Sequence, residues 1–323
     1  LKPLDAAPVE GSFRSPIAIH IADRTACPLF LGRHIRGLAN RPSPLWLRRW
    51  LEAIGLRPIS ALVDITNFLT FDLNRPLHVF DAGKLAGDLT VRLAQPGERM
   101  LALNGREYEL DPEITVIADA AGVHSLGGVI GGAASGCTEA TTEVFVEAAL
   151  FDPRRTAATG RRLDIASDAR YRFERGVDPA FVGPGLEIAT RLILELCGGE
   201  PSDIVVAGAE PDWRRDYVLR AERPATLGGL DVPPAESRAI LEALGCAVAE
   251  PAEGEGALRV GPPSWRGDIV GEADLVEEVL RIKGYERIPA VPLPRESAVS
   301  RPAIDAARRR AELVRRTLAA HQF

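Results

Sequence analysis

The sequence predicts an α+β protein, in which a mixed-sheet domain is followed by a small, winged-helix-like α+β domain and a C-terminal helix. Short strand-like runs recur between turn residues and helical patterns in the first part of the chain. At residues 207–216 (AGAEPDWRRD) this pattern breaks, and a second set of elements begins. The 323 residues, 46% of them hydrophobic, are enough for two cores. We therefore expect domains at 1–209 and 210–290, and a linker with the start of a further domain at 291–323.

In the first domain, the spacing predicts a helix over 43–55, with Ser43 as N-cap and Gly55 at its end. The apolar run that follows is interpreted as a buried strand ending at Thr66 and Asn67. Further strands are predicted at 89–94 (LTVRLA), 114–119 (ITVIAD), 127–132 (GGVIGG) and 143–151 (EVFVEAALF), and a helix is predicted at 187–199.

The second domain is expected to hold a strand at 217–220, a helix through 238–244, strands near Cys246 and Leu258, and a helix at 272–285. The prolines between 289 and 302 predict an extended connector. The pattern of the tail predicts an amphipathic helix, and no other predicted element is available for it to pack against. Its apolar side would consist of Ile304, Ala307, Ala311, Leu313 or Val314, and Leu318.

The charge, apolar runs and cysteines of the chain limit the kinds of protein it can be. A net charge of -6 argues against a chain that coats nucleic acid along its whole surface. We expect a soluble, cytoplasmic protein, because no apolar run reaches membrane-spanning length and the first residues lack the pattern of a signal peptide. The four cysteines are widely separated, which predicts packed, reduced thiols.

Polar residues that could form a site lie in three stretches. Residues 57–81 hold Arg57, Thr66, Asn67 and His78; the strand at 143–151 holds Glu147; and residues 167–179 begin with Ser167 and Ala169. A carboxylate within a strand needs a hydrogen-bond donor. The three stretches together predict one site assembled from distant parts of a domain.

These stretches resemble the β subunit of bacterial phenylalanyl-tRNA synthetase, specifically its central editing domain and its fifth domain. The motifs VDITN, RPLHVFD, GGVIGG, FVEAALFDP, SDARYRFERGVD and DLVEEVLRIKGY carry the resemblance. It implies an internal fragment whose partners are the α subunit and the phenylalanine tRNA, with no membrane involved. It also assigns aminoacylation, and the use of ATP, to the whole enzyme.

The implied activity is proofreading, that is, hydrolysis of tyrosine wrongly esterified to the phenylalanine tRNA. An apolar synthetic pocket rejects an added hydroxyl by only about a hundredfold. A second site that hydrogen-bonds the phenol reaches a discrimination of roughly ten-thousandfold, because phenylalanine would leave buried polar groups unpaired.

The resemblance gives each catalytic candidate a role, and each has a plainer alternative. Glu147 would bind the tyrosine hydroxyl, or form a structural salt bridge. His78, expected in a loop, would orient or deprotonate the attacking water, or pack as a structural residue. Thr66 and Asn67 would hold substrate or water, or satisfy the backbone of a turn.

The binding candidates are four further residues. Arg57 would grip the terminal phosphate or ribose, or form a surface ion pair. Gly131 would leave room for the amino acid, or only form a turn. The small Ser167 and Ala169 would leave room for an aromatic ring, or be ordinary loop residues.

Four carboxylates in the second domain form a candidate metal site: Asp268, Asp274, Glu277 and Glu278. Oxygen ligands one helical turn apart suit Mg²⁺, and the resemblance implies an ion shared with the α subunit. The alternative is an acidic helix start stabilised by the helix dipole.

Two other functions fit the sequence. One is a non-catalytic RNA-binding or assembly module that uses the arginines near the third stretch, which are Arg161, Arg162, Arg170, Arg172 and Arg175. The other is a freestanding deacylase, which the proline-rich exit and the unpartnered terminal helix argue against.

Overall fold

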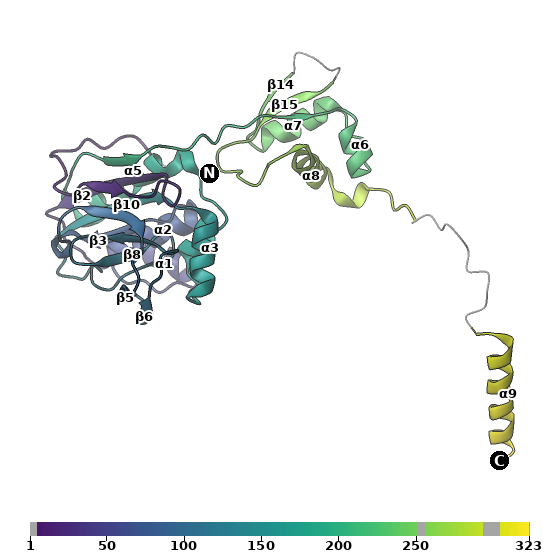
Figure 1. The fold of residues 1–323 in the computed structure, drawn as a ribbon. Coiled ribbons are helices and arrows are strands. Elements are labelled where there is room, and N and C mark those ends of the chain that lie inside the picture. Colours follow the sequence, from purple (N-terminus) through teal and green to yellow (C-terminus); the bar gives the residue numbers. More distant parts are fainter. Residues whose placement is uncertain (1–4, 251–255, 293–303, 323) are drawn as a thin grey trace.

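The computed structural model describes residues 5–250, 256–292 and 304–322 (Figure 1). The larger unit is built around a sheet of order β11-β2-β10-β3, with β12 also paired to β2. β10 (Glu143–Leu150) lies in the centre and runs antiparallel to both β2 (Leu29–Arg36) and β3 (His78–Asp81). The short strands β11 (Glu200–Pro201) and β12 (Val205–Gly208) pair with β2 on its other side.

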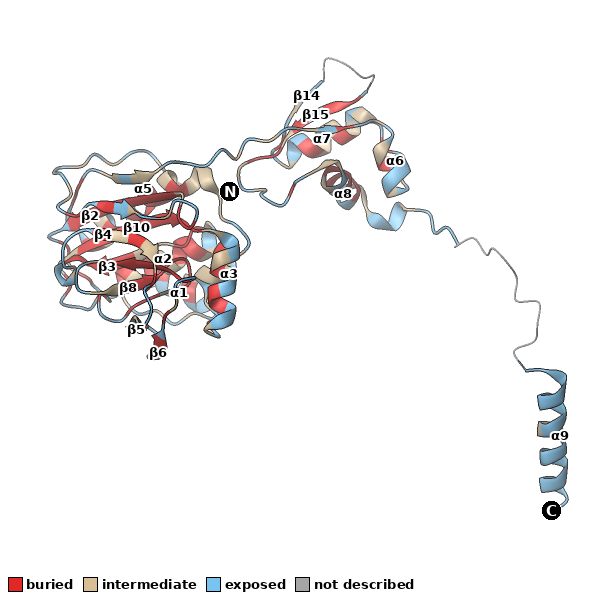
Figure 2. Cartoon of the chain, viewed as in Figure 1, coloured by how far each residue is buried: buried red, intermediate tan, exposed pale blue. Residues whose placement is uncertain are grey.

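Two layers cover this central sheet. One face packs against α1 (Leu45–Ala53), α2 (Ala61–Asp72) and α5 (Val182–Cys197). The other face packs against a second sheet of order β1-β4-β7-β8-β9, whose strands are Ile19–Ile21, Leu89–Leu93, Thr115–Ala118, Val123–Leu126 and Ile130–Gly131. The strands at the centre of the unit are largely buried (Figure 2). The α+β class and its mixed sheets are therefore confirmed.

Alternation along the central strands decides which side chains face which layer. In β10, Val144 and Val146 belong to the core on the helix side, whereas Phe145 and Ala149 belong to the core on the side of the second sheet. Because side chains alternate along a strand, Glu147 shares the face of Phe145 and Ala149. The central sheet thus directs this carboxylate toward the second sheet.

The predicted strand that ends at Thr66 and Asn67 is wrong, because residues 61–72 form helix α2. The buried positions, which include Leu62, Ile65 and Leu69, follow helical spacing and pack against α1 and α5. A short apolar run that is buried around most of its circumference gives no periodicity by which a helix and a strand can be told apart.

Other expectations for the first domain need smaller changes. α1 forms as predicted, but its N-cap position is Pro44, and the Ser43 hydroxyl donates instead to buried Asp64. α5 begins at Val182, five residues before the predicted start, and ends before Gly198. The remaining elements are β5 (Arg99–Leu101), β6 (Glu107–Glu109), α3 (Pro153–Arg162), α4 (Asp168–Phe173) and the 3-10 turns Ala82–Lys84 and Pro179–Phe181.

The smaller unit holds a three-stranded antiparallel sheet of order β13-β15-β14, packed against three helices. The strands are Tyr217–Leu219, Ala247–Ala249 (β14) and Leu258–Gly261. The helices are α6 (Arg223–Gly228), α7 (Pro234–Ala243) and α8 (Glu272–Lys283), followed by a 3-10 turn at Tyr285–Arg287. Each strand and helix expected here is present, and α6 is an addition.

The tail forms helix α9 (Ala306–Ala320), as predicted, and none of its residues is buried. Most of the proline-rich connector expected at 289–302 lies outside the described residues. All four cysteines are free, and three of them are buried. Among the described residues, no helix is long and apolar enough to cross a membrane.

Candidate active site

The edge of the central sheet brings His78 and Glu147 together. His78 is the first residue of β3, and its backbone pairs directly with Glu147 of β10. Side chains at such opposed positions have Cβ atoms about 5 Å apart and lie on the same face. The loop expected around His78 is therefore wrong, and the strand instead fixes the imidazole beside the carboxylate.

Both side chains line a cavity of about 60 Å³ between the central sheet and the β8–β9 hairpin. Its wall also includes Gly131 of β9, Ala169 of α4 and Phe173. Apart from Gly131, these residues come from the three stretches that the sequence singled out, so the fold joins those parts of the chain as expected.

Glu147 is a buried carboxylate without a partner. Only 5% of the residue is exposed, and its Oε2 is fully buried without a hydrogen bond. No salt bridge to it is found among the described residues. Burial raises the pKa of Glu147 to about 8, although the positive charge of Arg75 opposes the shift. A buried acceptor oxygen that has no hydrogen-bond partner can accept a hydrogen bond from a ligand hydroxyl.

Arg75 is a buried residue whose charge acts on Glu147, and the sequence did not single it out. It is 1% exposed, its Nη2 donates to the Ala149 carbonyl, and its Nε and Nη1 are buried without partners. Burial lowers its pKa to about 10, which still leaves it charged at neutral pH. Arg75 directly precedes Pro76 in the RPLH motif, but an arginine gives no pattern that predicts burial.

His78 presents a neutral imidazole to the cavity. Burial, and to a lesser extent His124, lower its pKa to about 4. Its Nε2 is buried and has no hydrogen-bond partner, and its ring packs edge-on against Phe80 at 4.4 Å between centroids. An unpaired ring nitrogen on a neutral imidazole can accept a hydrogen bond from water, or donate one, according to its tautomer.

Gly131 is required by the position of His78. A Cβ at Gly131 would lie 2.3 Å from the His78 Cε1 atom and 3.0 Å from a methyl group of Leu103. Any larger residue would therefore displace the imidazole or close the cavity. This contact explains the glycine more directly than a turn does, since its φ angle is not positive.

A second cavity, of about 320 Å³, adjoins the first along Pro76, Leu77, His78 and Ala169. Thr66 and Asn67 line this cavity. They lie on helix α2, and not on the strand that was predicted to end at these residues. The Thr66 hydroxyl donates to the Val63 carbonyl within the helix. Its lone pairs and the Asn67 amide are among the polar groups that line this cavity.

The remaining candidates in the first domain have different surroundings. Ser167 also lines the larger cavity, but its hydroxyl is occupied: it donates to the Val129 carbonyl and accepts from the Arg170 amide as the N-cap of α4. Arg57 lies exposed in the loop between α1 and α2 and lines neither cavity. The structure thus leaves Arg57 outside the site.

The carboxylates expected to hold Mg²⁺ do not gather. Arg266 binds both Asp268, at 2.6 Å, and buried Glu278, at 3.0 Å, and Arg281 also binds Glu278. Asp274 accepts from the Val270 amide, and Glu277 is exposed. Among the described residues, no group of three metal-ligating side chains is found. Oxygens held by guanidinium groups do not fit Mg²⁺, so this set does not form a metal site by itself.

Comparison with known proteins agrees with this arrangement. Residues 26–198 match the B3/4 domain, and residues 217–285 match the tRNA synthetase B5 domain. The chain belongs to the B3/4 domain family. The family resemblance inferred from the motifs is thereby confirmed, as is the class of protein, a subunit of an aminoacyl-tRNA synthetase.

Several curated relatives carry the name phenylalanine–tRNA ligase beta subunit. The chain is 60% identical to that of Paramagnetospirillum magneticum over 99% of its length, which is 40% of the relative. It is 53% identical to that of Cereibacter sphaeroides (99% of this chain, 39% of the relative) and 54% identical to that of Rhodospirillum rubrum (96% and 39%). The chain therefore spans about 40% of the length of these relatives.

A solved structure of an N-terminal fragment of the phenylalanyl-tRNA synthetase beta subunit from Pyrococcus horikoshii is a distant match. Its TM-score is 0.40 at 15% identity, over 84% of this chain and 76% of that chain. A similarity at this level supports no conclusion about the site.

Proposed function

We propose that the B3/4 unit hydrolyses the ester bond of tyrosine that has been attached to the phenylalanine tRNA in error. The observation that carries this proposal is Glu147, a buried carboxylate without a partner in a cavity shared with His78. The phenolic hydroxyl of tyrosine donates to this carboxylate, whereas phenylalanine leaves it unpaired. A hydrogen bond to the ionised carboxylate contributes about 1.5–3 kcal/mol. At pH 7 the cost of removing the Glu147 proton, about 1.4 kcal/mol for a pKa of about 8, must be subtracted from this value.

The hydrolysis uses water and the residues at the junction of the two cavities. With the tyrosyl side chain directed toward Glu147, the ester extends past His78 into the larger cavity, where Thr66 and Asn67 bind its polar atoms. The His78 imidazole orients the attacking water, since a neutral ring with an unpaired nitrogen suits that role. Water oxygen bonds to the ester carbon, the bond to the ribose oxygen breaks, and that oxygen takes a proton. The products are free tyrosine and uncharged tRNA.

The wider assignment follows from the relatives. We infer that the chain functions with the synthetase α subunit and the phenylalanine tRNA, and that ATP is used in aminoacylation by the whole enzyme. The units proposed for this role are residues 1–209 for editing and 210–290 for the B5 domain, followed by 291–323 as a linker and the start of a further domain. No step of the proposed hydrolysis involves Mg²⁺.

Three of the five arginines near the third stretch have partners within the unit, which favours hydrolysis over a module that only binds phosphate. Arg162 is paired with Asp111 and Glu113, and Arg170 is paired with Glu174. Arg172 lies over the Phe71 ring at 4.5 Å from its centroid. These side chains are committed to partners within the unit, which makes them poor carriers of a phosphate-binding function.

The decisive experiment measures deacylation of tyrosyl- and phenylalanyl-tRNA by this chain and by the complex with the α subunit. Glu147→Ala and His78→Ala are the test variants, and tRNA affinity is measured in parallel. We expect tyrosyl-tRNA to be hydrolysed much faster than phenylalanyl-tRNA, and both variants to slow that reaction while tRNA binding persists. Intact tRNA binding without any turnover in the complex would favour the non-catalytic module.

A further inference from the structure

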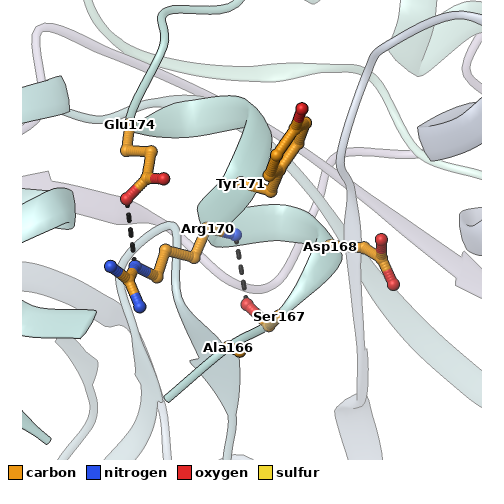
Figure 3. A pocket seen from close by; sticks show the side chains of 6 residues that line it. All are labelled: Ala166, Ser167, Asp168, Arg170, Tyr171 and Glu174. Carbon is orange, nitrogen blue, oxygen red and sulfur yellow. Dashed lines mark hydrogen bonds and ion pairs between the residues drawn. The ribbon is translucent and has the colours of Figure 1, made fainter. Parts of the chain in front are cut away.

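A third cavity opens beside the proposed substrate cavity, at the start of α4. It has a volume of about 360 Å³ and is lined by Ala166, Ser167, Asp168, Arg170, Tyr171 and Glu174 (Figure 3). Ser167 and Asp168 also line the cavity that holds Thr66 and Asn67. The two cavities therefore adjoin at these residues, so a molecule that fills one can extend into the other.

Tyr171 presents an aromatic surface at this cavity. The residue is 57% exposed, although tyrosine is a large hydrophobic side chain. The Arg175 guanidinium lies 3.7 Å from the ring centroid, and it also donates to the Tyr171 carbonyl and to Glu174. Arg175 thus stacks on the ring and supports it, while much of the ring surface stays open to solvent.

The polar groups around the ring divide into paired and available ones. Arg170 is paired with Glu174 at 3.0 Å, and Figure 3 shows this pair on one side of the helix, away from Asp168 and Tyr171. Asp168 lies three residues before Tyr171, on a neighbouring part of the helix surface. Its carboxylate is 58% exposed, with a single long contact of 3.5 Å to Arg172. An acceptor is therefore available close to the exposed ring.

We propose that Tyr171 is the stacking platform for the adenine of the terminal adenosine of the tRNA, whose esterified amino acid enters the neighbouring cavity. This inference rests on the proposed function, since the ester joins the amino acid to that adenosine. Aromatic rings bind nucleobases by stacking at about 1–3 kcal/mol per base. The adenine amino group donates, so Asp168 supplies a matching acceptor beside the ring. Arg175 contributes by holding the ring and by its charge.

The test uses a tyrosyl amide of 3′-amino-3′-deoxyadenosine, which cannot be hydrolysed as an ester, and the same amide of the uridine nucleoside. Tyr171→Ala should weaken binding of the adenosine amide by about 5- to 150-fold, the equivalent of one stacked base. Tyr171→Phe should retain most of the affinity, because stacking needs no hydroxyl. The matched control is Tyr285→Ala, which removes an exposed tyrosine from the B5 unit. Thermal unfolding verifies that each variant is folded.

Failure of this inference can be told apart from failure of the proposed function. Tyr171→Ala should leave the affinity for free L-tyrosine unchanged, and in deacylation of tyrosyl-tRNA the loss should fall on KM. Equal affinity of wild type and Tyr171→Ala for the adenosine amide would overturn the platform, whether or not hydrolysis occurs. An equal loss for the adenosine and uridine amides would overturn the recognition of adenine. If the amides bind in a base-dependent manner but tyrosyl-tRNA is not hydrolysed, only the proposed function would be wrong.

Discussion

Binding of tyrosine in the proposed pocket should be coupled to the loss of a proton from Glu147. Burial raises the pKa of this carboxyl to about 8, so at pH 7 the free site is mostly protonated. A phenolic donor favours the ionised form, so binding shifts the Glu147 carboxyl toward loss of its proton. By linkage, affinity for a tyrosyl ligand should increase with pH, by at most about tenfold per unit, until pH reaches about 8.

The assay is calorimetric titration of the tyrosyl amide and of the matching phenylalanyl amide between pH 6 and pH 8. Both ligands carry the same amino group, so the ratio of their affinities cancels its titration. Glu147→Gln keeps the size of the side chain and removes the ionisation. We expect the ratio to increase with pH in the wild type, and to be smaller and independent of pH in the variant.

Two results would rule out this coupling between tyrosine binding and ionisation of Glu147. A wild-type ratio that does not change with pH would show that the phenol does not meet an ionising carboxyl. A Glu147→Gln variant with the wild-type ratio would show that Glu147 does not contact the phenol. Proton release, measured in buffers of different ionisation enthalpy, gives an independent reading of the same coupling.

Further predictions concern the neighbours of Glu147 and the stability of the fold. His78→Ala should lower kcat for tyrosyl-tRNA by roughly a hundredfold or more, as for other positioned acid–base groups, and an unchanged kcat would remove His78 from the reaction. Gly131→Ala should reduce turnover while the protein stays folded, because the added Cβ overlaps the imidazole; full activity would show that the ring position is unimportant. Arg75→Met should raise the pKa of Glu147 further and move the pH dependence of the affinity ratio upward, whereas Arg75→Lys should move it less; the unfolding transition controls for damage to the core. The free energy of unfolding should fall by about 2 kcal/mol between pH 6.5 and pH 8, since the folded state holds the Glu147 proton longer than the unfolded state does. Below that range His78 opposes the trend, because its lowered pKa destabilises the fold as pH falls from 6.5 toward 4. In denaturant titrations, Glu147→Gln should remove the fall above pH 6.5, and a wild-type slope in that variant would contradict the assignment.

The strand carrying Glu147 could be predicted because β-branched and aromatic residues surround it, and the alternation of side chains follows from the strand. The helix carrying Thr66 and Asn67 could not, since a short run buried on several sides is compatible with either structure. The error left the two residues near the site, because α2 lines the cavity that adjoins the one lined by Glu147.

The sequence could not predict which charged side chains of the site are buried or paired. Nothing in the RPLH motif distinguishes a fully buried Arg75 from a solvated arginine, and only the packed structure shows it without a carboxylate partner. The acidic set in the B5 unit was predicted to bind Mg²⁺, and this prediction was wrong because of contacts that the sequence does not show. Its spacing suits a metal, but Arg266 reaches Asp268 and Glu278 from a loop, and no periodic pattern reveals such a contact.

Selection of the phenol by Glu147 is tested most directly by the ratio of hydrolysis rates for tyrosyl- and phenylalanyl-tRNA, measured with wild type and with Glu147→Gln in the complex with the α subunit. We expect a large ratio for the wild type and a ratio at least about tenfold smaller for the variant, the effect of one hydrogen bond to a charged group. The same ratio in both proteins would contradict the claim that a buried carboxylate selects the phenol.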